Sequence, residues 1–207
     1  MRVKLLAYNH LDGSVKALVM LGFKVSSGRV REKGIDHYLK DHSEDLSGWM
    51  IEGVKYPSVL EHVVFTFYIE GISRVTSHQL IRHRLASYTQ ESQRYSSISK
   101  DYVIPETVVK AGLGERFKKF MEDAFKLYEE FVNVGIPYED ARYVLPQAVT
   151  TRLIMTLNLR ELLHIACLRL SKDAQWEIRE LVRNMVTEVS NVLPEINKLV
   201  ERYCREV

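Results

Sequence analysis

Cysteine, proline and glycine are scarce in this sequence. The 207 residues include two cysteines, five prolines and ten glycines. Two cysteines exclude a disulfide-rich scaffold and a four-cysteine zinc site. We expect Cys167, which lies in the apolar segment IACL, to be an inert buried thiol in a reducing, cytoplasmic setting. The low proline and glycine content excludes collagen-like and linker-like chains.

Long apolar runs and an excess of one charge are also missing. No apolar run approaches the roughly 20 residues that a membrane-spanning helix needs, and the N-terminal run from Leu5 to Tyr8 is too short for a secretory signal. The chain has 29 Lys and Arg against 27 Asp and Glu. We therefore expect no membrane association and no dedicated nucleic-acid binding.

Several common motifs are absent. The sequence has no GxxxxGK[ST] phosphate loop, no GxGxxG dinucleotide turn, no HExxH and no GxSxG. The seven histidines are scattered, and none pairs with another at a spacing that puts both on one helical face. The sequence therefore predicts no metal site.

The hydrophobic pattern predicts mixed α and β structure in one domain over residues 1–207, because repeats and linkers are absent. β-Branched and aromatic runs predict strands, helical periodicity predicts helices, and polar residues predict a loop. The expected strands are 3–8, 62–70 (ended by Gly71) and 148–157, with an extended piece at 102–106; the expected helices include 73–84 and 116–132, and the expected loop is 85–100.

Three residues predict where helices begin and end. Ser73 is suited to cap the helix that follows it. Asn158, with Glu161 three residues later, resembles a capping box at the start of the helix LRELLHIACLRL. An apolar stripe runs from Ile178 to Ile196, and Pro194 should break or kink the helix within it.

The segment QLIRHRLASYTQESQRY, residues 79–95, has the composition of a binding site. Its arginines can form planar, paired hydrogen bonds with phosphate oxygens, and its glutamines can donate and accept at a base or a ribose. A solvated loop is the alternative interpretation. Arg142 and Arg169 lie next to apolar residues, where an unpaired charge is costly. Each predicts either a carboxylate partner or an anionic ligand, and the sequence leaves both open.

The same segment resembles the signature of the flavin-dependent thymidylate synthases, which is Arg-His-Arg, seven residues, then Ser. Here it reads Arg82-His83-Arg84, LASYTQE, Ser92. The resemblance extends to SVLEHVVFTF, DARYVLPQ, the residues around Asn158 and LRLSKDAQWEIR. It therefore runs from about residue 57 to 179.

This resemblance implies a fold, a reaction and partners. The implied fold is an α+β domain with a central, mainly antiparallel sheet flanked by helices and no Rossmann turn. The implied reaction converts dUMP to dTMP, with 5,10-methylenetetrahydrofolate as one-carbon donor and NADPH as reductant through FAD. The implied assembly is a cytoplasmic homotetramer whose active sites are shared between subunits.

The resemblance also implies site residues. Arg169 would face the uracil ring, where a guanidinium stabilises negative charge at the N3/O4 edge and raises electron density at C5. Arg142, from a neighbouring subunit, would help hold the phosphate. The implied FAD contacts are Ser58, Arg82, His83, Arg84, Gln90, Asn158, Leu159, Arg160 and His164. The implied dUMP contacts are Gln79, Leu80, Ile81, Arg82, Gln90, Glu91, Ser92, Gln93, Arg94, Arg142 and Arg169.

Some residues depart from the family pattern. Tyr56 stands where many members have a histidine, and tyrosine cannot become a cation near neutral pH. Gln90 stands where relatives can have an acid, and His164 where they can have an amide. Ser92 lacks a sequence-local base, so we assign it to substrate binding and not to nucleophilic attack.

Two other functions fit parts of the sequence. The Arg-rich segment 79–95 could bind nucleic acid or a nucleotide, with Tyr88 and Tyr95 as stacking surfaces. The chain could also be a family member that has lost catalysis, for which Tyr56 is the one hint.

Overall fold

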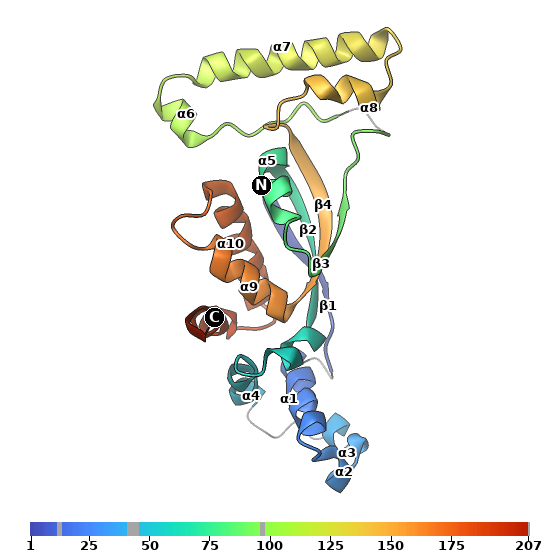
Figure 1. Cartoon of the computed structure of the whole chain (residues 1–207), viewed down its shortest axis with the longest axis vertical. Helices are drawn as coiled ribbons and strands as arrows, with labels where there is room; N and C mark the ends of the chain where they lie inside the picture. The colour runs from blue at the N-terminus through green and yellow to red at the C-terminus, as the bar shows by residue number, and fades with distance from the viewer. Residues whose placement is uncertain (12–13, 41–45, 96–97, 207) are drawn as a thin grey trace. The chain divides into compact units, whose positions relative to one another are not determined.

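The computed structural model describes residues 1–11, 14–40, 46–95 and 98–206. They form a mixed α+β fold around a four-stranded antiparallel sheet (Figure 1). The strand order is β1-β2-β4-β3. The strands are β1 (Arg2–Tyr8), β2 (Val64–Ser73), β3 (Ala86–Gln90) and β4 (Thr150–Asn158).

Helices make up most of the remaining described chain. The α-helices are α1 (Val15–Ser26), α2 (Val30–Lys33), α3 (Ile35–Lys40), α4 (Leu46–Gly53), α5 (Arg74–Leu80), α6 (Glu106–Lys110), α7 (Gly114–Asn133), α8 (Tyr138–Ala141), α9 (Leu159–Arg169), α10 (Trp176–Ser190) and α11 (Ile196–Glu206). Two short 3₁₀ helices are η1 (Pro57–His62) and η2 (Arg142–Val144). None of these described helices is long and apolar enough to span a bilayer.

The chain divides into two units, and all four strands contribute residues to both. The first unit consists of Met1–Arg2, Ile69–Arg82 and Thr89–Leu153. The second unit consists of Val3–Tyr68, His83–Tyr88 and Ile154–Val207. The prediction of one domain over residues 1–207 stays a prediction.

The second unit has its core between the sheet and the helices that follow β4. Phe65 and Phe67 are fully buried and alternate with half-buried neighbours, as expected for a strand with one covered face. Helices α9, α10 and α11 pack against one another (Figure 1). Leu162 and Leu181 are among their fully buried residues. This packing fixes α9, which holds several of the expected site residues.

The first unit has a smaller core beneath α7. Met121 and Phe125 of α7 pack with Val149, just before β4. Tyr102 forms an antiparallel bridge with Val149, so the expected extended piece at 102–106 reduces to that bridge before α6 begins. The predicted helix at 116–132 is confirmed as α7.

Several boundary signals in the sequence are confirmed. The Ser73 side chain accepts a hydrogen bond from the Thr76 N–H at 3.1 Å and caps α5. The Asn158 side chain accepts one from the Glu161 N–H at 2.9 Å and caps α9. The apolar stripe is interrupted between α10 and α11, where Pro194 lies. The strand predicted at 3–8 is β1, and the one predicted at 148–157 is β4.

The prediction that Gly71 ends its strand is wrong. Strand β2 continues through Gly71 to Ser73. Gly71 has a φ of 71°, and a Cβ at this position would lie 3.3 Å from the backbone of Met1. Glycine therefore lets the strand pass close to the start of the chain, where a side chain would be strained and crowded.

Two other expectations about residues 73–100 are corrected. The helix predicted at 73–84 ends at Leu80, and residues 86–90 of the predicted loop form strand β3. Strand β3 pairs with β4 at one edge of the sheet, and the Glu91 N–H donates to the Arg152 carbonyl at 2.9 Å. Pairing with β4 stabilises a polar sequence that has no strand periodicity of its own.

The expectation of an inert Cys167 thiol is also wrong. Cys167 on α9 and Cys204 on α11 form a disulfide, with their Cα atoms 5.4 Å apart. The two residues are separated by 37 positions in the sequence. Packing of α11 against α9 brings them together, which the spacing of the cysteines does not predict.

Candidate functional site

The second unit brings together a cluster of four polar side chains, made of His83 and three residues around it. The Arg169 Nε–H donates to His83 Nε2 at 3.0 Å. A carboxylate oxygen of Glu161 lies 3.7 Å from His83 Nδ1. The His164 ring faces the His83 ring edge-on, with centroids 6.4 Å apart. Three of these residues were predicted for the site, and α9 supplies all of them except His83.

His83 is held neutral by its surroundings. Burial lowers its pKa to about 4, with the charges of Arg169 and His164 adding to the effect. The residue is 5% exposed. Its carbonyl oxygen accepts a hydrogen bond from the Tyr88 hydroxyl at 2.8 Å, which fixes the backbone. The imidazole is therefore a neutral group near pH 7.

Glu161 is a buried acid in the first turn of α9. It is 5% exposed, and burial raises its pKa, while the charges of His164 and Arg160 oppose the increase. Burial raises the pKa of Tyr88 as well, and the charge of Glu161 adds to that increase. The sequence predicted Glu161 only as part of a helix cap.

Arg169 is the last residue of α9, where a cation is favourable. Within the described part of the chain, no carboxylate lies within ion-pairing distance of it, and its hydrogen bond is to His83 through Nε. Its two terminal nitrogens have no hydrogen-bond partner among the residues that the structure describes. Of the two interpretations left open by the sequence, the anionic ligand is favoured.

The first unit contains a second cluster, centred on Arg74 and Arg142. Both residues line a pocket of about 280 Å³, together with His78, Gln93, Tyr143, Leu145, Pro146 and Gln147. Arg142 is partly buried, and its Nε–H donates to the Glu139 carbonyl at 3.0 Å. No carboxylate of the described residues pairs with Arg142, so an anionic ligand is again favoured.

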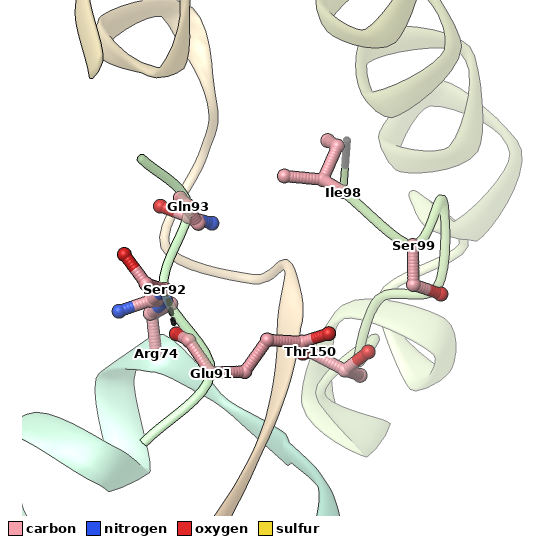
Figure 2. Close-up of a pocket in the computed structure, with 7 residues that line it drawn as sticks. All are labelled: Arg74, Glu91, Ser92, Gln93, Ile98, Ser99 and Thr150. Carbon is pink, nitrogen blue, oxygen red and sulfur yellow. Dashed lines mark hydrogen bonds between the residues drawn. The ribbon is translucent and has the colours of Figure 1, made fainter. Parts of the chain in front are cut away.

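Arg74 anchors the segment that begins at Glu91. Its Nη2 group donates to the Glu91 carbonyl at 3.3 Å, which Figure 2 shows as a dashed line beside Ser92. Its Nε is buried with no hydrogen-bond partner. Burial and the neighbouring charge of Arg142 lower the pKa of Arg74, and Glu91 opposes them. Two guanidiniums that repel each other would be stabilised by an anion.

Four polar residues of the 90–94 segment, namely Gln90, Glu91, Ser92 and Arg94, have partners within the first unit. The Gln90 amide donates to the hydroxyls of Ser77 at 3.2 Å and Thr151 at 3.1 Å. The Glu91 carboxylate lies 3.4 Å from Arg152 Nε. The Ser92 hydroxyl accepts from the Arg94 N–H at 3.2 Å, and Arg94 pairs with Glu139 at 2.9 Å.

The predicted site residues between positions 79 and 84, which precede the 90–94 segment, differ in their exposure to solvent. In the first unit, Leu80 is fully buried, Gln79 is partly buried, and Ile81 and Arg82 are exposed. In the second unit, Arg84 is exposed. No carboxylate of the described residues pairs with Arg82 or with Arg84. Leu80 offers no surface to a ligand in this chain.

The remaining predicted residues lie around α9 and η1. Leu159 is fully buried in the core. Asn158 uses its side-chain oxygen for the helix cap, and Arg160 pairs with Glu61 at 2.5 Å. Ser58 lines a pocket of about 620 Å³ in the second unit with Asn9, Leu18, Leu21, Gly22, Val25, Ser26, Val59 and His62.

Sequence reasoning missed Arg74, His78 and Glu161. Arg74 and His78 lie one turn apart on α5, a spacing that marks one face once the helix is known. Nothing in the sequence pairs Glu161 with His83. Among the residues that the structure describes, no group of three or more His, Cys, Asp or Glu side chains could hold a metal ion.

Comparison with known proteins identifies the family. The family model described as "Thymidylate synthase complementing protein" matches residues 5–195. The flavin-dependent thymidylate synthase of Sulfolobus acidocaldarius is 42% identical over 210 residues, covering 99% of this chain and 78% of that protein. The chain belongs to the family of flavin-dependent thymidylate synthases. Membership implies the predicted reaction, dUMP to dTMP, and its use of FAD, NADPH and methylenetetrahydrofolate.

Other flavin-dependent thymidylate synthases give the same result. The Pyrococcus abyssi protein is 46% identical over 167 residues, covering 77% of this chain and 68% of that protein. The Pyrococcus furiosus protein is 51% identical over 146 residues. That match covers 68% of this chain, and the chain spans 60% of the P. furiosus protein.

A solved structure supports the fold. It is a UMP/dUMP methylase, PolB, from Streptomyces cacaoi, bound with 5-Br dUMP. It aligns with a TM-score of 0.81 at 24% identity, covering 99% of this chain and 96% of that chain. The α+β architecture predicted from the resemblance is confirmed, and the assembly of subunits stays a prediction.

Proposed function

We propose that this chain itself converts dUMP to dTMP as a flavin-dependent thymidylate synthase, with Arg169 as the catalytic residue. The observation that supports this assignment most directly is the state of the Arg169 side chain. One nitrogen is bound to His83 at 3.0 Å, and the two terminal nitrogens have no partner among the described residues. The side chain is thus oriented and still has donors for a substrate.

The chemistry of the uracil ring explains why a fixed guanidinium matters. C5 of uracil is a poor nucleophile, and a guanidinium at the N3/O4 edge favours the form of the ring that carries negative charge there, which raises the electron density at C5 before it attacks a one-carbon unit. Donors that are already oriented toward this edge stabilise the charge without the cost of reorganisation. Arg169 therefore has the charge and the geometry for this role.

We assign the phosphate of dUMP to Arg74 and Arg142. The pocket of about 280 Å³ that they line can take a phosphate group, and arginine forks suit phosphate oxygens. Gln93 lines the same pocket, so Arg142 and the 90–94 segment of one chain can act on one ligand. The resemblance assigns Arg142 to a neighbouring subunit.

The described residues suit FAD. Its diphosphate needs cations, and Arg82 and Arg84 are exposed guanidiniums without carboxylate partners in the described chain. The pocket beside Ser58 combines apolar side chains with polar atoms of Asn9 and His62, as expected for a site that holds a large aromatic ring. FAD, when bound, supplies the hydride chemistry that side chains cannot. We retain Ser58, Arg82, Arg84, Asn158, Arg160 and His164 as its contacts.

Assembly and location complete the proposal. We propose a homotetramer with shared active sites, as the resemblance to the family implies. We also propose a cytoplasmic location. Although disulfides are uncommon in reducing compartments, they do occur in intracellular proteins of hyperthermophiles. The homotetramer is tested by analytical ultracentrifugation of the purified protein, which should give the mass of four chains. The mass of one chain would contradict it.

The activity is tested by release of tritium from dUMP labelled at C5, with methylenetetrahydrofolate and NADPH, with and without FAD. Release that requires FAD is expected. Release by protein shown to be free of flavin would contradict the flavin route. No release from folded, flavin-loaded protein would favour the catalytically inactive alternative.

A further inference from the structure

We propose that Glu161 and His83 are positioning residues that orient Arg169 through one chain of contacts. In this series of contacts, the Glu161 carboxylate keeps the His83 proton on Nδ1. His83 Nε2 then accepts the hydrogen bond from Arg169 Nε–H. The effect of these contacts on catalysis rests on the proposed function of Arg169. The assignment of the His83 proton to Nδ1 does not depend on that function.

The contact with Arg169 shows which nitrogen of His83 carries no proton. A guanidinium has five N–H donors and no acceptor. The Nε–H of Arg169 lies 3.0 Å from His83 Nε2, so Nε2 must be the acceptor. A neutral imidazole has one proton, which must then be on Nδ1. A proton on Nε2 would place two donors face to face.

The Glu161 carboxylate is the acceptor best placed for the proton on His83 Nδ1. Its Oε1 lies 3.7 Å from His83 Nδ1, with both side chains about 5% exposed. This separation is longer than a hydrogen bond, and contacts of this kind commonly shorten when a ligand binds. The ring of His164 and the hydroxyl of Tyr88 also face this region. Neither offers a carboxylate, so Glu161 is the strongest acceptor there.

Burial strengthens the interaction between the Glu161 carboxylate and the Nδ1 proton of His83. Water does not compete for polar groups at about 5% exposure, and electrostatic interactions are stronger in a low dielectric. Asn158 holds the N-terminal end of α9 through the Glu161 N–H. Glu161 and Arg169 begin and end the same helix, so His83 bridges two points of a rigid element. Such a support restricts the guanidinium to one orientation.

The first test identifies the tautomer of His83. The full-length protein, labelled with ¹⁵N-histidine, is examined by NMR near pH 7, and the His83 signal is assigned by its loss in His83→Asn. The expected wild-type signal is that of an Nδ1-protonated neutral ring. Glu161→Leu, which removes the acceptor, should shift the ring toward the Nε2-protonated form. Glu161→Gln keeps an amide oxygen and should shift it less.

A matched control separates this effect from the loss of any partly buried carboxylate. Glu188 on α10 accepts a hydrogen bond from the Leu5 N–H at 3.0 Å and lies in the same unit. Glu188→Leu should leave the His83 tautomer as in the wild type. An Nε2-protonated ring in the wild type, or an unchanged tautomer in Glu161→Leu, would overturn the proposal.

The second test measures function. Glu161→Leu should lower kcat for tritium release by about 10- to 100-fold, by analogy with the loss of the hydrogen-bond partner of a metal-ligating histidine. The KM for dUMP and the bound FAD should change much less. Glu161→Gln should recover part of the rate. Because the contacts act in series, Glu161→Leu should cost little further in a His83→Asn background.

The outcomes distinguish the two proposals. If the wild type releases no tritium while the tautomers behave as expected, the proposed function fails and the role of Glu161 toward His83 stands. If the wild type is active and Glu161→Leu matches Glu188→Leu in kcat, the positioning role fails and the proposed function stands.

Discussion

Arg169 and His83 lie 86 positions apart in the sequence, and their Nε and Nε2 atoms lie 3.0 Å apart. The first residue ends α9, and the second lies in the turn between α5 and β3. This contact turns a permanently charged, long side chain into an oriented one. It also explains why the central residue of the Arg-His-Arg signature is buried while Arg82 and Arg84 are exposed.

Replacing Arg169 with Ala should nearly abolish dTMP formation. Loss of one preorganised donor in a site of this kind lowers kcat by about 100- to 1000-fold, and Arg169 is expected to supply the main one. Bound FAD, measured by its absorbance in the purified protein, should remain. Arg183→Ala, at an exposed position of α10, is the matched control. Normal tritium release by Arg169→Ala would rule out its catalytic role.

Replacing Arg142 with Ala should weaken dUMP binding about 10-fold or more. A hydrogen bond to a charged group is worth about 1.5–3 kcal/mol, and Arg142 is expected to make one to the phosphate. Deoxyuridine lacks the phosphate, so its affinity should be the same in both proteins. Titration calorimetry measures both ligands. Arg116→Ala on α7 is the control, and an equal loss for deoxyuridine would remove Arg142 from the phosphate site.

His83 should make stability depend on pH in a defined window. The folded protein has a His83 pKa of about 4 against an ordinary value of 6.5. Between these values the unfolded chain binds the extra proton and the folded chain does not. The free energy of unfolding should therefore fall as the pH is lowered from about 6.5 to about 4. The raised pKa of Glu161 acts in the opposite sense.

Urea unfolding of wild type and His83→Asn at several pH values isolates this contribution. The variant should lose less stability than the wild type across the same window. Parallel profiles would show that His83 has an ordinary pKa in the folded protein. The tritium-release rate should not change near pH 6.5 through His83, because its ring is already neutral there.

Reduction of the Cys167–Cys204 disulfide should lower the free energy of unfolding by about 4 kcal/mol. This magnitude follows from the loss of a cross-link over 37 residues in the unfolded chain. Urea unfolding with and without a reductant measures the loss. The Cys167→Ser/Cys204→Ser double variant should be insensitive to the reductant. Two free thiols in the untreated protein, counted by mass after alkylation, would show that the bond does not form.

The sequence alone determined the features that depend on neighbouring residues and on motif identity. Ser73 and Asn158 marked helix starts because capping requires only a side-chain oxygen and an N–H three residues later. Pro194 marked a break because it has no N–H to donate. The signature Arg82-His83-Arg84 with Ser92 identified the family, since its residues stand at fixed spacings along the chain.

Tertiary structure decided the features that depend on residues far apart in sequence. Strand β3 forms because β4 supplies its hydrogen bonds, and the disulfide forms because α11 packs on α9. The partners of His83 lie about 80 positions further along the chain, so no local pattern connects Glu161 or Arg169 to it. Burial of that cluster excludes water, and the resulting loss of solvation sets the protonation of His83, a property that composition and spacing do not contain.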